Sequence, residues 1–242
     1  MNKKIFDCVT FFQETLHLKL RLNILKDVID QFIICESIYD HRGNKKDIIF
    51  DKKKFPEFEK KINHLIIKEP FPQKNIPWEN QALQRDYIFT GLEEANDNDL
   101  ILFSDPDEIP NPDKLYKLEL EKKYAIFLQS MYTYKINIFN HYESPWEGTR
   151  ASKKKDLKSI DWLRQKVLLK NLRYSFWRFD KEKSIQVIHN GGWHFNYLLT
   201  PKNISKKLKS LAATEWNYGE GISKEEFYSL KNIEDKILNK KD

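Results

Sequence analysis

Short apolar runs separated by polar loops recur along the first half of the chain. Residues 5–12, 31–35 and 64–67 are dense in aliphatic and aromatic side chains, which is typical of strands. Residues 100–103 are apolar at every position, the pattern of a strand that is buried on both faces. These runs predict the strands of a central sheet.

Helical patterns lie between these runs. Residues 14–30 contain both a strand-like and a helical repeat of leucines, and the length of the segment favours a helix. Residues 55–61 are predicted to be helical, and Pro77 opens a predicted helix of about four turns. Alternation of strands and helices predicts a single α/β domain with a mostly parallel sheet and helices on both faces.

The second half of the chain has a different pattern. Residues 124–139 are rich in aromatic and β-branched side chains and predict one or two long strands. A loop, HYESPWEGTR, is expected at residues 141–150. Residues 162–169 and 185–189 predict further strands, and the Lys-rich tail from Pro201 is predicted to be helical.

Composition and charge bear on the size of the core, the kind of partner and the cellular compartment. The 242 residues are 40% hydrophobic and 14% aromatic, enough for a sizeable core. The 42 basic and 36 acidic residues are interleaved, so short basic runs such as Lys52–Lys54 indicate solvated faces and no nucleic-acid partner. Cys8 and Cys35 lie in apolar runs, which favours buried reduced thiols. With no signal-peptide pattern and no apolar run long enough to span a bilayer, we expect a cytosolic protein.

Three carboxylates directly follow the fully apolar strand: Asp105, Asp107 and Glu108. Pro106 keeps Asp105 out of helical geometry, so this acidic corner is extended and stiff. Ligands of open α/β sheets bind beyond the carboxyl ends of the strands, and carboxylates crowded there repel one another unless a cation lies between them. A hard divalent ion that shares its shell with substrate phosphates fits this corner. The alternative is an acidic turn before a helix that starts at Pro112.

Several stretches of the chain carry a family resemblance. In chain order they are DCVTFFQETLHLKLRLNIL, ICESIYDHRGNKK, WENQALQRD, LILFSDPDEIP, PWEGTR and GGWHFNYL. Together, over roughly residues 5–200, they resemble glycosyltransferase family 17, whose best-known members add the bisecting N-acetylglucosamine to N-glycans. No G-x-G-x-x-G or phosphate-cradling G-x-x-x-x-G-K motif is present, so neither a dinucleotide fold nor a P-loop is supported.

The resemblance implies a glycosyltransferase A-type fold, an inverting mechanism and a UDP-sugar donor, with UDP-N-acetylglucosamine expected. It also implies a divalent metal ion, Mn²⁺ or Mg²⁺, and a saccharide acceptor. On this basis residues 1–123 form a nucleotide-sugar-binding half, residues 124–200 an acceptor-side half and residues 201–242 a helical tail. The chain departs from the family where Pro106 replaces an aliphatic residue and where KLKSLAATEWN matches the family's tail poorly.

The resemblance also suggests metal ligands. Asp107 matches the usual direct ligand, whereas Asp105 would serve the ribose or bind the ion through water, and Glu108 is a spare carboxylate. GGWHF offers Trp193 as a stacking ring for a sugar and His194 as a further metal ligand or a donor to phosphate. The simpler interpretation of His194 is a structural histidine.

Two other stretches offer donor-binding candidates. Glu36 follows the second strand and should reach the carboxyl edge of the sheet, where Arg42 and Lys45 of the next loop are candidates for contacts with phosphate or uracil. Gln84 and Arg85 lie on one face of the helix that Pro77 opens, and the guanidinium fork of Arg85 suits phosphate or carboxylate. An ordinary polar loop and a surface salt bridge are the alternatives.

An inverting transfer needs a general base that takes the proton of the acceptor hydroxyl. Glu147 is the first candidate because Trp146 beside it offers a platform for a sugar ring. Glu143, Asp161 and Glu215 are further candidates, and the sequence does not choose among them.

Two other function classes remain open at this point. Clustered carboxylates and a formal charge of +6 also suit a metal-dependent phosphodiesterase or nuclease, which would need further acidic or His ligands for a second metal ion. A non-catalytic carbohydrate-binding protein would use the same aromatic residues to stack sugars, and its acidic corner would be purely structural.

Overall fold

The computed structural model describes residues 3–210, 223, 226 and 229–239. Its strands are β1 (Ile5–Phe11), β2 (Gln31–Ser37), β3 (Ile62–Ile67), β4 (Leu100–Ser104), β5 (Glu108–Pro110), β6 (Tyr124–Thr133), β7 (Trp146–Lys153), β8 (Ile185–Ile188) and β9 (Gly192–Asn196). Its α-helices are α1 (Thr15–Leu25), α2 (Pro77–Tyr87), α3 (Pro112–Tyr116), α4 (Ile160–Lys166), α5 (Pro201–Ser210) and α7 (Leu230–Asn239). The predicted helical turn at residues 55–61 is a 3₁₀ segment, Pro56–Lys61.

These strands form one sheet in the order β3-β2-β1-β4-β7-β6-β9-β5, with β8 paired to β6. β1 is parallel to β2 and β4, and β2 is parallel to β3. β7 runs antiparallel to both of its neighbours, β4 and β6, and β5 runs antiparallel to β9. The predicted single α/β domain with a mostly parallel sheet is confirmed.

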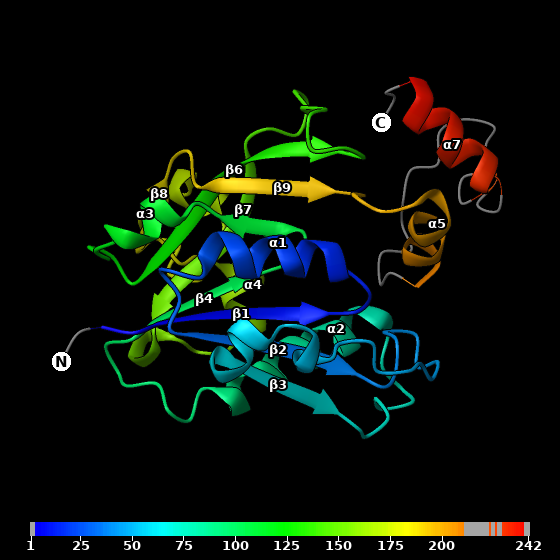
Figure 1. Ribbon diagram of the computed structural model, residues 1–242. Helices are drawn as coiled ribbons and strands as arrows, with labels where there is room; N and C mark the ends of the chain where they lie inside the picture. Colours follow the sequence, from blue (N-terminus) through cyan, green and yellow to red (C-terminus); the bar gives the residue numbers. More distant parts are fainter. Residues whose placement is uncertain (1–2, 211–222, 224–225, 227–228, 240–242) are drawn as a thin grey trace.

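Helices cover both faces of the sheet, as predicted. α1 lies on one face, and α2 and α4 lie on the other (Figure 1). Leu18 and Leu22 of α1 belong to one hydrophobic cluster, and Ile160 and Leu163 of α4 belong to a second cluster across the sheet. Burial between these two layers explains why β4 is apolar at nearly every position.

Two further expectations concern thiols and membrane spans. Cys8 and Cys35 are both buried free thiols, as expected, and burial raises the pKa of Cys35 to about 12.

Over the described ranges, no helix has the length and apolar character that crossing a bilayer requires.

The strand predicted at residues 162–169 is wrong, because this segment contains most of helix α4. Ser159 caps the helix by accepting a hydrogen bond from the Trp162 backbone amide at 3.1 Å. Ile160 and Leu163 are three positions apart and reach the core on one helical face, and Val167, directly after the helix, is buried in the same cluster. The aromatic and aliphatic content of the segment concealed this helical spacing.

The loop predicted at residues 141–150 is wrong in its second half, which belongs to β7 near the middle of the sheet. Thr149, Arg150 and Ser152 on this strand are almost completely buried. Thr149 meets Ser104 of β4 at 2.7 Å and Gln129 of β6 at 3.0 Å through side-chain hydrogen bonds. A central strand with polar, hydrogen-bonded side chains does not show the apolar pattern of a buried strand.

The predicted helical tail is confirmed where the structure describes it. α5 and α7 pack together through Ile204 and Ile233. KLKSLAATEWN begins in α5 and continues into residues outside the described part of the chain.

Candidate functional site

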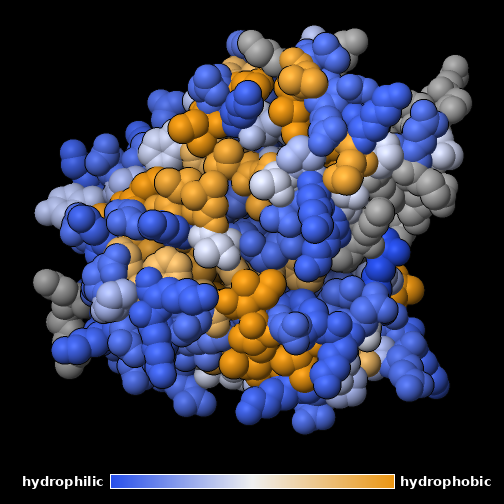
Figure 2. Space-filling model, turned by 45° about the vertical axis from the view of Figure 1, so that its right-hand side comes forward, coloured by the Kyte–Doolittle hydropathy of each residue, from blue (hydrophilic) through white to orange (hydrophobic). Residues whose placement is uncertain are grey.

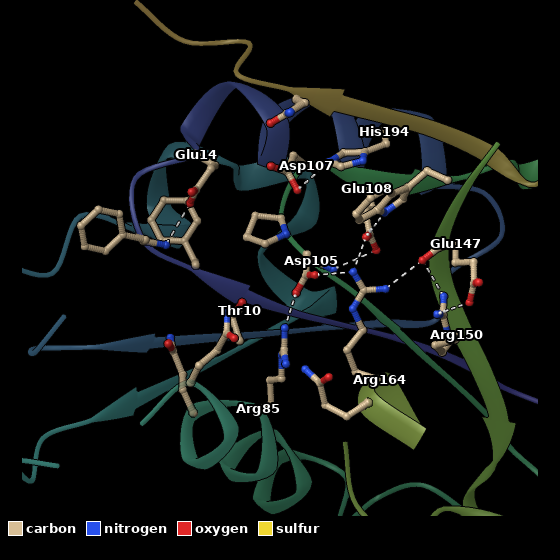
Figure 3. A pocket seen from close by; sticks show the side chains of 18 of the residues that line it. Thr10, Glu14, Arg85, Asp105, Asp107, Glu108, Glu147, Arg150, Arg164 and His194 are labelled. Carbon is tan, nitrogen blue, oxygen red and sulfur yellow. Dashed lines mark hydrogen bonds and ion pairs between the residues drawn. The ribbon is translucent and has the colours of Figure 1, made fainter. Parts of the chain in front are cut away.

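A cavity of about 800 Å³ opens beyond the carboxyl ends of β1 and β4 (Figure 3). Its walls come from the end of β1, the loop after β2, helices α2 and α4, strands β7 and β9, and the acidic corner at residues 105–108. On the molecular face shown in Figure 2, hydrophilic side chains cover much of the surface and hydrophobic ones gather in separate patches. The cavity lies at the edge where open α/β sheets bind their ligands.

Asp105 is engaged by two arginines. Its carboxylate accepts hydrogen bonds from Arg85 of α2 at 3.1 Å and from Arg164 of α4 at 2.7 Å. Burial raises the pKa of Asp105, but the charges of Arg164 and Arg85 outweigh burial and lower that pKa to about 2. Asp105 is therefore ionised and turned toward two cations at neutral pH.

Glu108 makes the acidic corner rigid. Its carboxylate accepts hydrogen bonds from Arg164 at 2.8 Å, from the Trp146 indole at 2.8 Å and from the Asp105 backbone amide at 3.2 Å. Burial lowers the pKa of Arg164, but Asp105 and Glu108 reverse the shift and raise it. Arg164 therefore stays charged and joins the acidic corner to the carbonyl groups of β7, which it contacts at Glu147 and Gly148.

Asp107 and His194 lie together at the rim of the cavity. His194 Nε2 is 3.5 Å from the Asp107 carboxylate, and both side chains line the cavity. In Figure 3 they face one another, whereas the Asp105 carboxylate is directed toward Arg85 and Arg164. Because β9 is paired with β5 on one side and β6 on the other, His194 is held opposite Glu108 and Met131.

A buried ion pair supports the acidic corner from beneath. Arg21 of α1 and Asp7 of β1 are fully buried and bonded through two nitrogens at 2.5 Å each. Arg21 also donates to the Ser104 hydroxyl at 2.9 Å and to the backbone carbonyl of Glu108. These contacts fix both ends of the turn that carries Asp105 and Asp107.

The helix opened by Pro77 supplies two predicted site residues to the cavity wall. Gln84 donates to the Cys35 carbonyl at 3.0 Å and contacts His41 at 2.7 Å, so it ties α2 to β2. Arg85 bridges Asp105 and Asp161, each at about 3 Å. The prediction that these two residues share one helical face is confirmed.

Four predicted donor-binding residues do not line this cavity. Glu36 is buried in β2 and accepts hydrogen bonds from Lys46 and from the backbone amides of Ile49 and Phe50 in the loop after that strand. Arg42 and Lys45 are exposed on the same loop. Trp193 packs against the core cluster on the α1 face. Its neighbour His194 points to the other side because side chains alternate along a strand.

The general-base candidates have different surroundings. Glu147 lines the cavity, pairs with Arg150 at 3.2 Å and accepts the Leu169 backbone amide at 3.0 Å. Glu143 also lines the cavity and is exposed there. Asp161 is bonded to Arg85 and does not line the cavity, and Glu215 lies outside the described residues.

Sequence reasoning missed three arginines that organise the site: Arg21, Arg150 and Arg164. Arg21 offered a detectable signal because it stands next to Leu22 and three residues after Leu18, on the apolar stripe of α1. Arg150 and Arg164 offered none, because one was expected in a loop and the other in a strand.

The possible metal ligands at the cavity rim are too few to hold a cation alone, so a bound substrate would have to supply further ligands. Among residues 3–210, 223, 226 and 229–239, no three His, Cys, Asp or Glu side chains form a group able to hold a metal ion. Asp107 and His194 offer one carboxylate and one imidazole. Mg²⁺ is commonly bound by one or two carboxylates together with substrate phosphates, so this pair fits an ion that arrives with a diphosphate.

The fold and its cavity define an α/β protein whose ligand site lies at the carboxyl edge of a mostly parallel sheet. The model of glycosyltransferase family 17 matches residues 1–242, so the chain belongs to this family, as the sequence predicts, and is a glycosyltransferase. No curated protein matches the chain.

Several solved structures overlap with this fold. A glycosyltransferase involved in glycosylation of the major capsid of the virus PBCV-1 shares 13% identity, with 77% of this chain and 82% of that chain covered and a TM-score of 0.36. The glucosyl-3-phosphoglycerate synthase from Mycobacterium tuberculosis, in complex with Mn²⁺ and UDP, shares 11% identity. The match covers 88% of this chain and 82% of that chain, with a TM-score of 0.41. A mannosyltransferase from Pyrobaculum calidifontis with GDP-mannose and Mn²⁺ shares 8% identity. That match covers 98% of this chain and 70% of that chain, with a TM-score of 0.42. With TM-scores below 0.5, these overlaps carry no argument about the donor or metal of this chain.

Proposed function

We propose that this chain is a metal-dependent, inverting glycosyltransferase that moves N-acetylglucosamine from a UDP-sugar to a saccharide hydroxyl. The observation that carries the proposal is that the carboxylates of the acidic corner have different partners. Asp105 and Glu108 are engaged by Arg164, while Asp107 from the turn after β4 and His194 from β9 converge on the cavity. In this proposal residues 1–123 bind the donor with the help of His194, and the rest of residues 124–200 binds the acceptor.

Asp107 and His194 would hold Mn²⁺ or Mg²⁺ together with the donor diphosphate, and the ion would stabilise negative charge on the departing diphosphate as a Lewis acid. Arg85 and Arg164 contribute fixed positive charge behind the corner. Asp105 acts by orienting these two guanidinium groups. Gln84 keeps its proposed role in the donor wall, whereas the positions of Glu36, Arg42, Lys45 and Trp193 argue against donor contacts for them.

The acceptor side of the cavity contains Trp146 and both glutamates. The Trp146 indole is fixed by Glu108, and its ring centroid is 4.9 Å from that of His194, which makes it a rigid platform for a sugar. We propose Glu147 as the general base that takes the acceptor proton, with Glu143 as the alternative. Arg150 and the Leu169 amide hold Glu147 in place for that role.

The test is a screen of nucleotide sugars with Mn²⁺ and with a chelator, with release of the free nucleotide as the readout. We expect slow UDP release from UDP-N-acetylglucosamine with Mn²⁺ only, and a faster release when a saccharide acceptor is added. Cleavage of DNA or RNA would indicate a phosphodiesterase instead. Saccharide binding without nucleotide release from any donor would indicate a non-catalytic binding protein.

A further inference from the structure

An exposed aromatic stretch lies between α4 and β8. Every residue from 172 to 180 is exposed. Phe176, Trp177 and Phe179 within it have exposed fractions of 80%, 61% and 91%. We call residues 172–183 the aromatic segment. Aromatic surface of this extent in contact with water is unfavourable, so it marks a surface that a partner covers.

Hydrogen bonds give the aromatic segment a defined shape. The Arg178 amide donates to the Ser175 carbonyl at 3.0 Å, and the Lys181 amide donates to the Arg178 carbonyl at 3.1 Å. The Lys183 ammonium donates to the same Ser175 carbonyl. The Phe176 and Trp177 rings meet edge to face, with centroids 5.0 Å apart. The segment therefore presents its rings from a built turn.

Positive charge accompanies the rings. The aromatic segment contains four basic and two acidic side chains, a net charge of +2. Arg178 and Lys181 lie over the Tyr174 ring, at 5.3 and 5.6 Å from its centroid, and also pair with Asp180. Cations and exposed rings thus share one surface.

A hollow of about 360 Å³ lies between the aromatic segment and the start of α4. The Lys158 ammonium stands 4.2 Å from the Trp162 ring centroid in its wall. The other lining residues that carry charge or a ring are Phe176, Arg178, Phe179, Asp180, Lys181, Glu182 and Lys183. A small basic hollow next to exposed rings suits a lipid phosphate with acyl chains beside it.

We infer that the aromatic segment docks this enzyme on an anionic membrane surface. Phe176 and Phe179 carry no hydrogen-bonding group, so they fit the boundary between headgroups and acyl chains better than a polar saccharide surface. Lys and Arg beside such rings attract anionic headgroups. The inference is independent of the proposed donor and metal. Lys170, which lines the cavity of the candidate site, stands two residues before the segment.

The test is flotation of the full chain with vesicles of phosphatidylcholine alone or mixed equally with phosphatidylglycerol. We expect binding to the mixed vesicles, weakened by salt. The double variant Phe176→Ser/Phe179→Ser should reduce binding at least about tenfold, because it removes the apolar contact area. Tyr116→Ser is the matched control, since Tyr116 is 79% exposed on α3, outside the segment, and its loss should leave binding unchanged.

The double variant should keep the wild-type melting temperature and wild-type nucleotide release in solution, so a failure of the proposed chemistry is separately visible. Absence of binding to the mixed vesicles would overturn the inference. Equal binding by wild type and double variant would overturn it as well. Retention on a saccharide matrix through Phe176 and Phe179, without vesicle binding, would instead make the segment a carbohydrate surface.

Discussion

At the scale of single residues, the acidic corner contains carboxylates with opposite tasks. Asp105 neutralises Arg85 and Arg164, whereas Asp107 faces His194 and the cavity. Two aspartates that stand two positions apart in the sequence should therefore respond differently to the same substitution.

Asp107→Asn should abolish metal-dependent nucleotide release and leave the fold intact, with activity below about a tenth of wild type at saturating Mn²⁺. Asp105→Asn should lower the free energy of unfolding by about 1–3 kcal/mol, because it leaves two guanidinium groups without their shared carboxylate. Urea unfolding and nucleotide release on both variants check this pair. Equal loss of stability in the two would contradict the assignment.

Asp105 also predicts acid sensitivity. Its pKa is lowered from 3.8 to about 2 in the folded state, so the folded state holds this proton less readily than the unfolded state. The carboxylate therefore stabilises the fold above about pH 4, by about 2 kcal/mol, and this contribution disappears as the pH falls toward 2. The difference in unfolding free energy between wild type and Asp105→Asn should shrink over that range. A constant difference from neutral pH down to pH 2 would refute the ion-pair explanation.

At the scale of elements, the site depends on the close pairing of β5 with β9. Gly192 begins β9 with φ +134°, and a Cβ atom there would lie 2.1 Å from the Ile109 carbonyl oxygen. Only glycine permits this approach, which sets His194 opposite Glu108.

Gly192→Ala should therefore cost about 3 kcal/mol or more of unfolding free energy, because backbone strain and a backbone clash act together. Gly43→Ala is the matched control. Gly43 has φ +85° with nothing within 4 Å of the added Cβ, so only the strain of about 1 kcal/mol applies. Urea unfolding compares the two variants. Similar losses would show that the pairing of β5 and β9 is not under this steric constraint.

At the scale of the whole molecule, the cavity gathers segments from residue 10 to residue 197. A diphosphate held by Asp107 and His194, as proposed, would contact both halves of the chain, and binding to the native state alone raises apparent stability.

UDP with Mn²⁺ should stabilise the protein by about 3 kcal/mol at a hundredfold excess over Kd, whereas UDP with a chelator should give a much smaller effect. Thermal melting with UDP, Mn²⁺ and both together measures the difference. Asp107→Asn and His194→Ala should each remove the joint effect while melting near the wild-type temperature without ligand. Equal stabilisation by UDP with and without the ion would contradict a diphosphate bound through metal.

The local pattern of apolar residues was sufficient to predict the elements that are buried through apolar side chains. β1, β2, β3 and β4 were predictable because each contains a short, mostly apolar run, and the carboxylates after β4 are visible because they directly follow such a run. The N-cap at Asn111 and the helix start at Pro112 were also local, since the capping hydrogen bond spans only two residues.

The partners of the acidic corner were decided by tertiary structure alone. Arg164 reaches Asp105 across 59 positions, and β7 carries Arg150 through the middle of the sheet on a strand whose buried side chains are polar. A polar residue can be buried only if hydrogen bonds and opposite charges meet it there. Those partners come from distant segments, so no local pattern reveals them. The sequence thus determined where the carboxylates stand, and only the fold decided that Asp105 is neutralised while Asp107 faces the cavity.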